Sequence, residues 1–166
     1  MWEDIIKILD EDISMGQAYE DLCILMGMSG HDAGKLMAMA PYANEKLKLK
    51  KVFLLNENDI RDVKIVGEYN SFQEKANFCN WLQEYCQTWV KKMIIQAVEL
   101  SNCKNVVLSG GYFLNCTSNS FVRKNLSPEI KIFIEPICGD QGVSIGLSKY
   151  KWYDKTKSKK IKPLKN

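Results

Sequence analysis

The sequence predicts an α/β fold built on a parallel sheet, and three observations support this prediction. Residues 104–153 alternate between strand and helix patterns, in the order strand, helix, strand, helix. A glycine-rich turn follows each strand, as "SGG" at 109–111 and "CGDQG" at 138–142. A long amphipathic helix is expected before them, over residues 71–101. Parallel strands end on one side of a sheet, so both turns are expected there, where such sheets bind ligands.

The first third of the chain predicts short elements. Residues 3–9 and 15–27 have helical patterns, with a break near residues 14–16. A glycine-bounded turn at 29–34 precedes a short apolar helix that Pro41 should end. Two strands, "KVFLL" at 51–55 and "VKIVG" at 63–67, are expected on either side of a polar loop.

The rest of the chain carries the stronger periodicity. In the long helix the apolar residues recur at spacings of three and four: Ala76, Phe78, Trp81, Leu82, Tyr85, Trp89, Met93 and Ile94. Its length exceeds that of most helices, so a kink or a break within it would not be surprising. "KNVVLSG" (104–110) and "KIFIEP" (131–136) are the expected strands, "YFLNCTSNSFVRKNL" (112–126) the helix between them, and a final helix follows residue 142.

Composition bounds the class of protein. The 166 residues suffice for one domain or for one lobe of a larger protein, and an apolar fraction of 46% argues against a disordered chain. No apolar run approaches the roughly 20 residues that span a bilayer. The acidic start "MWEDIIKILDED" lacks the basic segment of a signal peptide. We therefore expect a cytoplasmic protein without a membrane partner.

Cysteines and charges narrow the class further. The six cysteines have irregular spacing and no CxxC pair, which predicts reduced and mainly buried thiols instead of disulfides or a structural zinc site. From Lys149 onward, eight lysines face one aspartate, whereas residues 1–148 carry 15 basic and 19 acidic residues. We interpret residues 151–166 as a solvated basic linker or tail, and nucleic acid is the less favoured reading.

The paired glycines at 110 and 111 raise two alternatives. Glycine accepts a positive φ and lets another group approach the main chain closely, which suits a phosphate or ribose at the start of a helix. Asn115 would then lie one turn into that helix, where its side chain can hydrogen-bond a ribose or a neighbouring loop. The other reading is a plain tight connection between strand and helix.

Asp140 also has two readings. It lies in an irregular turn made by Pro136, Gly139 and Gly142, close to the start of the final helix. Its carboxylate could cap that helix, or it could bind a hard or borderline metal ion. Lys35 follows Gly34 at another helix start and could meet a phosphate as a point charge, although the surrounding sequence is not a P-loop.

Four blocks in the same order resemble the carbamoyltransferases of nodulation and antibiotic biosynthesis. They are "ISMGQAYEDLCILMGM", "GKLMAMAPY", "VLSGGYFLNCTSNS" and "IFIEPICGDQGVSIG", at residues 13–28, 34–42, 107–120 and 132–146. The resemblance implies that residues 1–150 form one lobe of an actin-like or sugar-kinase-like (ribonuclease H-like) fold, with a mixed sheet and flanking helices. This lobe would be the second half of the transferase domain.

The resemblance also implies a chemistry. Such enzymes make carbamoyladenylate from carbamoyl phosphate and ATP, and then transfer the carbamoyl group to a hydroxyl of a sugar-type or antibiotic-type acceptor. Gly110, Gly111 and Asn115 match the adenosine-binding segment. Asp140, preceded by Gly139, matches a catalytic aspartate that helps to hold an iron-type divalent metal. Gly34 and Lys35 match a further motif position of the nucleotide site.

The chain departs from the family pattern in three ways. His31 is its single histidine, so the HxxxH pair of the family's metal site is missing. We also expect the family's second domain, which forms carbamoyladenylate, to be absent after residue 150. Tyr112 and Phe113 replace small residues after the glycines, which would narrow an adenosine pocket. We expect a partial O-carbamoyltransferase that is inactive alone, needs the missing lobe and domain, and can self-associate through an exposed face. The alternatives are a non-catalytic nucleotide-binding or partner-binding remnant and a relative of the tRNA threonylcarbamoyl transferases.

Overall fold

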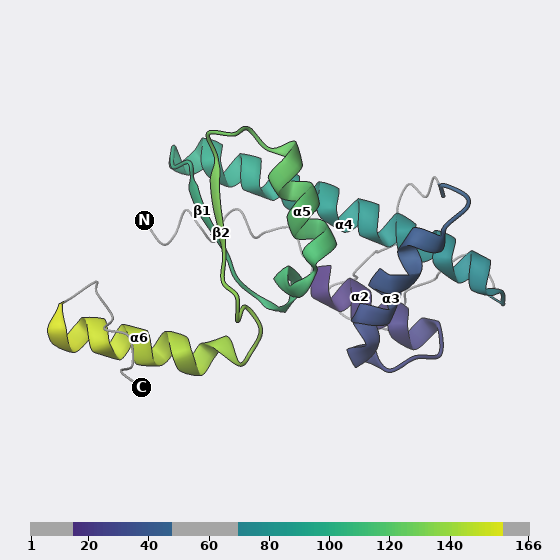
Figure 1. Ribbon diagram of the computed structural model, residues 1–166, viewed down its shortest axis with the longest axis horizontal. Helices are drawn as coiled ribbons and strands as arrows, with labels where there is room; N and C mark the ends of the chain where they lie inside the picture. Colours follow the sequence, from purple (N-terminus) through teal and green to yellow (C-terminus); the bar gives the residue numbers. More distant parts are fainter. Residues whose placement is uncertain (1–14, 48–69, 158–166) are drawn as a thin grey trace, which may run out of the picture.

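The computed structural model describes residues 15–47 and 70–157. This part of the chain is mostly helical, with one small parallel sheet (Figure 1). The α-helices and strands, in chain order, are α2 (Met15–Leu25), α3 (Ala33–Met39), α4 (Phe72–Ser101), β1 (Asn105–Leu108), α5 (Cys116–Asn125), β2 (Lys131–Ile134) and α6 (Gly142–Thr156). Three short 3₁₀ helices, η1 (Gly30–Asp32), η2 (Ala40–Tyr42) and η3 (Gly111–Leu114), lie between them. No helix within the described ranges is long and apolar enough to cross a membrane.

Helix α4 is the longest element and confirms the expected helix over 71–101. It begins with a capping box, in which the Ser71 hydroxyl accepts a hydrogen bond from the Glu74 amide and the Glu74 carboxylate accepts one from the Ser71 amide. It ends where Asn102 takes a left-handed conformation with φ of 51°. The helix runs unbroken over its 30 residues, so its length brings no break.

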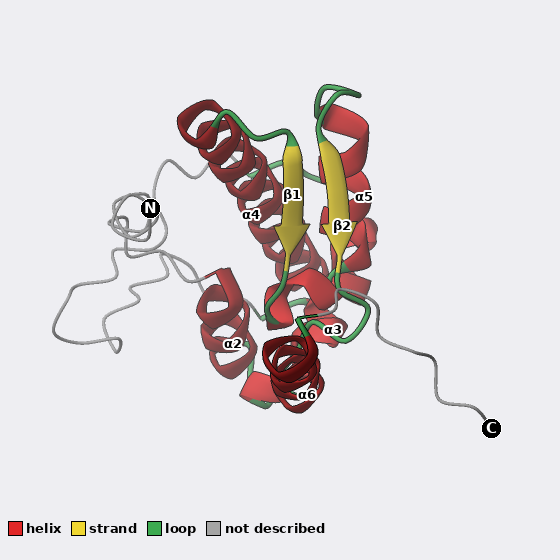
Figure 2. Cartoon of the chain, turned by 90° about the vertical axis from the view of Figure 1, so that its left-hand side faces the viewer, coloured by secondary structure: helices red, strands yellow, loops and turns green. Residues whose placement is uncertain are grey.

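The two strands pair in parallel, as expected from the strand–helix–strand pattern. Val107 lies opposite Phe133, and Leu108 lies opposite Ile134. Leu108 and Ile134 point toward the core under α4 and α5, whereas Val107 and Phe133 are 68% and 54% exposed on the other face of the sheet. Figure 2 shows this outer face toward the viewer, with α4 and α5 behind it.

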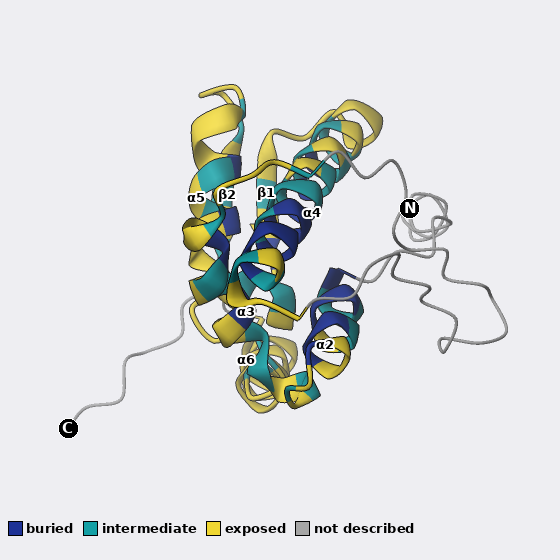
Figure 3. Ribbon diagram, turned by 90° about the vertical axis from the view of Figure 1, so that its right-hand side faces the viewer, coloured by how far each residue is buried: buried dark blue, intermediate teal, exposed yellow. Residues whose placement is uncertain are grey.

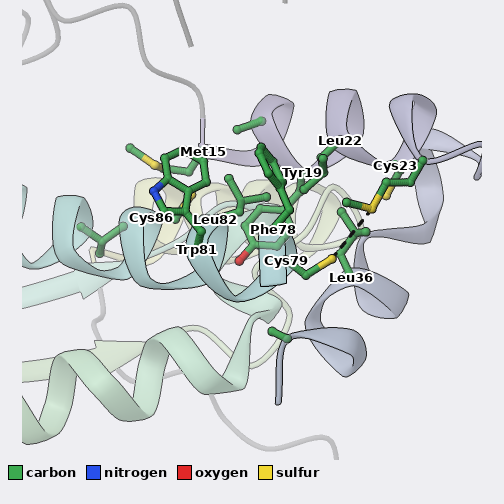
Figure 4. Packing of buried hydrophobic residues seen from close by; sticks show 14 of the residues in the cluster. Met15, Tyr19, Leu22, Cys23, Leu36, Phe78, Cys79, Trp81, Leu82 and Cys86 are labelled. Atoms are coloured by element: carbon green, nitrogen blue, oxygen red, sulfur yellow. Dashed lines mark hydrogen bonds between the residues drawn. The ribbon is translucent and has the colours of Figure 1, made fainter. Parts of the chain in front are cut away.

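The core lies where α2, α3 and α4 meet. Leu22, Leu36, Phe78 and Leu82 are almost fully buried there, together with the thiols of Cys23, Cys79 and Cys86 (Figure 4). Burial raises the pKa of Cys79 and of Cys86 to about 12, which keeps both thiols protonated and inert. Four of the six cysteines are buried, which confirms that the thiols are mainly buried.

Several boundaries differ from the sequence-based expectation. The helix expected over 112–126 begins at Cys116, because Asn115 caps it and residues 111–114 form η3 instead. Helix α2 includes Gly16 and ends at Leu25, two residues early, where Gly27 adopts a positive φ. Helix α6 runs from Gly142 to Thr156, and the boundary between lobe and tail at residue 150 stays a prediction. The helix expected at 3–9 and the strands expected at 51–55 and 63–67 lie outside the described residues.

Candidate nucleotide-binding turn

The two glycine-rich turns lie against each other at the carboxyl ends of β1 and β2. The Gly110 amide donates a hydrogen bond to the Cys138 carbonyl at 2.8 Å, and the Glu135 amide donates to the Leu108 carbonyl at 3.2 Å. Thus the backbone itself joins the turn after the first strand to the turn after the second. The expectation that both turns share one end of the sheet is met (Figure 2).

Gly110 and Gly111 have different reasons to be glycine. Gly110 has a φ of 116°, a conformation that residues with a side chain rarely adopt. Gly111 has an ordinary φ, is exposed, and a Cβ placed on it would meet no atom within 4 Å. The fold therefore requires glycine at 110 only. The open space at Gly111 leaves its main chain accessible to another molecule.

The main-chain amides beside this space are unused. Neither the Gly111 nor the Tyr112 amide donates a hydrogen bond to any group in the described part of the chain. The Phe113 amide, by contrast, donates to the Gly110 carbonyl at 3.0 Å and closes the turn. Two consecutive amides of this kind can donate hydrogen bonds to an anionic oxygen, and no side chain is needed.

Asn115 supports this turn from within the protein. Its side chain is 4% exposed and caps α5, where its Oδ1 accepts a hydrogen bond from the Ser118 amide at 2.9 Å. Its Nδ2 donates to Gln83 Oε1 at 3.0 Å and to the Tyr19 hydroxyl at 3.3 Å. Asn115 thus lies at the start of the helix, not one turn into it as expected, and a contact with a ribose would require one of these bonds to break.

The two aromatic residues after the glycines turn inward. The Tyr112 hydroxyl lies 2.7 Å from Ser118 Oγ, and its ring lies 6.2 Å from that of Tyr19. Phe113 packs edge-on against Tyr112 at the margin of the core. Burial raises the pKa of both Tyr19 and Tyr112, so their hydroxyls remain protonated. The rings of Tyr112 and Phe113 therefore pack against the core and not over the turn.

Asp140 is exposed at the end of the second turn. Its main-chain carbonyl accepts a hydrogen bond from the Val143 amide at 3.1 Å. Its carboxylate makes no capping bond to α6, which begins at Gly142, and the N-cap residue Gln141 makes no side-chain capping bond either. The carboxylate is therefore free to bind another group. Across residues 15–47 and 70–157, no cluster of three or more acidic, cysteine or histidine residues could hold a metal.

Glycine 142 is required by the shape of this second turn. A Cβ there would lie 2.1 Å from the Ile137 carbonyl oxygen, a distance that no real side chain tolerates. At Gly139 the nearest atom to an added Cβ is Gln141 Oε1, at 2.7 Å, at the end of a flexible side chain. The backbone therefore folds tightly on itself between Ile137 and Gly142, and this places Asp140 at its apex.

Gly34 and Lys35 lie elsewhere, on α3. The Lys35 ammonium pairs with Asp32 at 2.9 Å and lowers the pKa of that carboxyl group. Asp32 also accepts a hydrogen bond from the Ser29 amide, at 3.2 Å, in a second capping box. Among the described residues no hydrogen bond or ion pair joins Lys35 to either glycine-rich turn. The site as described thus contains Gly110, Gly111, Gly139 and Asp140, and the placement of Gly34 and Lys35 in it stays a prediction.

Sequence reasoning missed Tyr19, Gln83 and Ser118, which hold Asn115 in place. Their polar atoms meet inside the protein although Tyr19 and Gln83 are 64 residues apart. A separate groove of about 520 Å³ between α4 and α5 is lined by Gln87, Cys116 and Lys124 among others, but by none of the predicted site residues.

Comparison with known families gives one match. The family model described as "Carbamoyltransferase N-terminus" matches residues 73–148, from the first turn of α4 into α6. The matched span contains both glycine-rich turns. No curated protein matches the chain, and no solved structure does either.

Proposed function

We propose that this chain is one lobe of an O-carbamoyltransferase. The matched family model supports this proposal, because it indicates a carbamoyltransferase and thus carbamoyl transfer in general. The chain's two turns would take the adenylate and one metal ligand. The observation that carries the proposal is the hydrogen bond between Gly110 and Cys138. It joins the turn in which the Gly111 and Tyr112 amides have no partner among the described residues to the turn that carries the exposed Asp140 carboxylate. Carbamoyladenylate, formed from carbamoyl phosphate and ATP, would lie across the two turns.

The first turn suits an adenylate for reasons of shape and charge. The open space over Gly111 allows a bulky group to approach the main chain. The free amides of Gly111 and Tyr112 would donate to a phosphate or ribose oxygen. Asn115 would act from behind the turn, by fixing the start of α5. The acceptor would be a small molecule with a hydroxyl group.

The second turn would supply one ligand of a metal site. The exposed Asp140 carboxylate suits an iron-type divalent ion, and such an ion, when bound, would polarise the carbamoyl carbonyl as a Lewis acid. One carboxylate surrounded by water does not hold such an ion firmly. The other ligands would come from a first lobe, so we expect no catalysis by residues 1–166 alone.

The exposed apolar side chains support the need for a partner. Val107 and Phe133 occupy the open face of the sheet, and α6 has no buried residue although it carries Leu147 and Trp152. Figure 1 shows α6 standing apart from the other helices. Soluble proteins rarely leave such a surface uncovered. A first lobe, a C-terminal domain, or a second copy of the chain would cover it.

Titration with AMP and ATP tests the nucleotide site. We expect Gly111→Val to weaken binding at least tenfold, because its side chain would fill the space that the ligand needs. The substitution should leave the fold intact, since a Cβ at Gly111 meets no atom within 4 Å in the described part of the chain. Gly146→Val in α6 is the matched control, because Gly146 also has open space around it. Equal affinities of wild type and Gly111→Val would reject the proposed site, as would the absence of nucleotide binding by the wild type.

A further inference from the structure

Gln83 is a buried polar residue in the apolar stripe of α4. It is 5% exposed, and its neighbours Leu82 and Cys86 are fully buried. An apolar side chain of the same length would serve the core equally well at such a position. The burial of a polar amide at this position therefore needs an explanation, and its hydrogen bonds provide one.

The Gln83 amide joins three elements. Its Oε1 accepts hydrogen bonds from the Tyr19 hydroxyl of α2 at 2.6 Å and from Asn115 Nδ2 at 3.0 Å. Its Nε2 donates to Ser118 Oγ of α5 at 3.0 Å. Ser118 Oγ in turn lies 2.7 Å from the Tyr112 hydroxyl of η3. Both polar atoms of Gln83 are used, and its partners come from α2 and from the start of α5.

These bonds lead directly to the nucleotide-binding turn. Asn115 ends η3 and starts α5, and its amide donates to the Tyr112 carbonyl at 3.0 Å. Tyr112 carries one of the two free amides. With its carbonyl bonded to Asn115 and its hydroxyl to Ser118, Tyr112 cannot rotate without breaking one of these hydrogen bonds.

We propose that Gln83 is a positioning residue for the nucleotide-binding turn: through Asn115 and through Ser118 and Tyr112 it fixes the direction of the Gly111 and Tyr112 amides. This inference rests on the proposed function. Gln83 touches no ligand. Its loss would leave Asn115 Nδ2, the Tyr19 hydroxyl and Ser118 Oγ short of a partner in the interior, and they would recover partners by shifting the turn.

The variant Gln83→Met tests the proposal, because it keeps the size of the side chain and removes its hydrogen bonds. We expect at least a tenfold loss of AMP affinity, measured well below the unfolding temperature. Gln96→Met, at an exposed position of the same helix, should bind as the wild type does. Val90→Ala, a core variant of α4 outside the network, should lower the unfolding temperature but leave the affinity within twofold. A purely structural role would make Gln83→Met and Val90→Ala behave alike, which would overturn the proposal.

Amide hydrogen exchange gives a second readout that needs no ligand. In Gln83→Met, exchange should become at least tenfold faster at residues 111–118 and change little in α3. Unchanged exchange there would overturn the positioning role even if the wild type failed to bind AMP, and that failure would count only against the proposed function. Tyr112→Phe and Tyr19→Phe each remove a single hydroxyl group. If Gln83→Met does not fold, unaltered affinity and exchange in both tyrosine variants would likewise overturn the proposal.

Discussion

At the scale of the residue, glycine has distinct roles in the same molecule. Gly142 lies so close to the Ile137 carbonyl that an added methyl group would overlap it, whereas a Cβ at Gly146, one turn further along α6, would meet nothing. Glycine 142 is thus required by packing, and glycine 146 is not. The same comparison separates Gly110, which the backbone conformation requires, from Gly111, which the fold does not require.

This difference makes a prediction about stability. Gly142→Ala should lower the free energy of unfolding by about 1–3 kcal/mol, because the turn must open to admit the methyl group. Gly146→Ala should raise the same quantity by up to ~1 kcal/mol, because alanine favours the helix. Urea unfolding followed by circular dichroism measures both. A Gly142→Ala protein as stable as Gly146→Ala would contradict the tight turn at Ile137.

Sequence reasoning selects those candidate site residues whose pattern is local. Glycines after a strand and an acid before a helix are visible without any knowledge of the tertiary structure, and both turns lie where they were expected. Gln83 and Tyr19 escaped notice because each looks ordinary in its own helix. Their hydrogen bonds form only when α2, α4 and α5 pack together, and a contact between such distant residues cannot be deduced from one sequence.

At the scale of the element, α4 shows how the ends of a helix depend on charge. The Glu74 carboxylate accepts hydrogen bonds from the Ser71 amide at 2.9 Å and from the Asn70 amide at 3.1 Å. These bonds, with the Ser71 hydroxyl, lower the pKa of Glu74. Because they favour the ionised form, the cap is strongest when the carboxylate is charged.

The cap therefore predicts a dependence on pH. A carboxyl group with a lowered pKa in the folded state stabilises the protein above its ordinary pKa, and this contribution is lost as the pH falls through the folded-state pKa. Wild type should be more stable than Glu74→Gln at pH 7, and the difference should shrink on acidification. Chemical unfolding at a series of pH values measures it. Glu99→Gln, at the exposed other end of α4, should show no such trend, and a constant difference for Glu74→Gln would refute the charged cap.

Element type was easier to predict than element boundaries. Helix α4 and strands β1 and β2 formed where their hydrophobic periods predicted them. The helix after β1 was placed four residues too early, because the apolar run from Tyr112 to Leu114 extends the helical pattern. Asn115 decides the start, since its side chain satisfies the amide of Ser118.

At the scale of the whole molecule, burial is uneven. The buried residues of α4 face α2, α3 and α5, whereas α6 is exposed along its whole length (Figure 3). The expected α/β class is confirmed in its coarse form, as helices with a small parallel sheet. The actin-like lobe, with its mixed sheet, stays a prediction. Fold class follows from periodicity, but the number and order of strands depend on contacts between distant segments.

This uneven burial predicts an assembly, which mixing experiments can test. With a first-lobe fragment of a carbamoyltransferase, the wild-type chain should form a complex that binds ferrous iron. Phe133→Lys should weaken the complex at least tenfold, because it puts a charge on the apolar face of the sheet. Asp140→Asn should leave the complex intact and reduce its iron affinity at least tenfold.

Each of these two variants is the control for the other. Sedimentation velocity reports the complex, and metal analysis after gel filtration reports the iron. Phe133→Lys should also reduce any association of the chain with itself, which the same sedimentation experiment detects. If Phe133→Lys assembles as well as the wild type, the sheet face is not the interface. If Asp140→Asn retains full iron binding, the acid is not a ligand.

The hydrogen bond from Gly110 to Cys138 has a consequence for how such a protein can diverge. Because main-chain hydrogen bonds that do not involve residues 140 and 141 tie the two turns together, we expect exchange of those two side chains to leave the spacing between the turns unaltered. During evolution, new reactive side chains could therefore appear in the second turn while the first turn keeps its main-chain geometry.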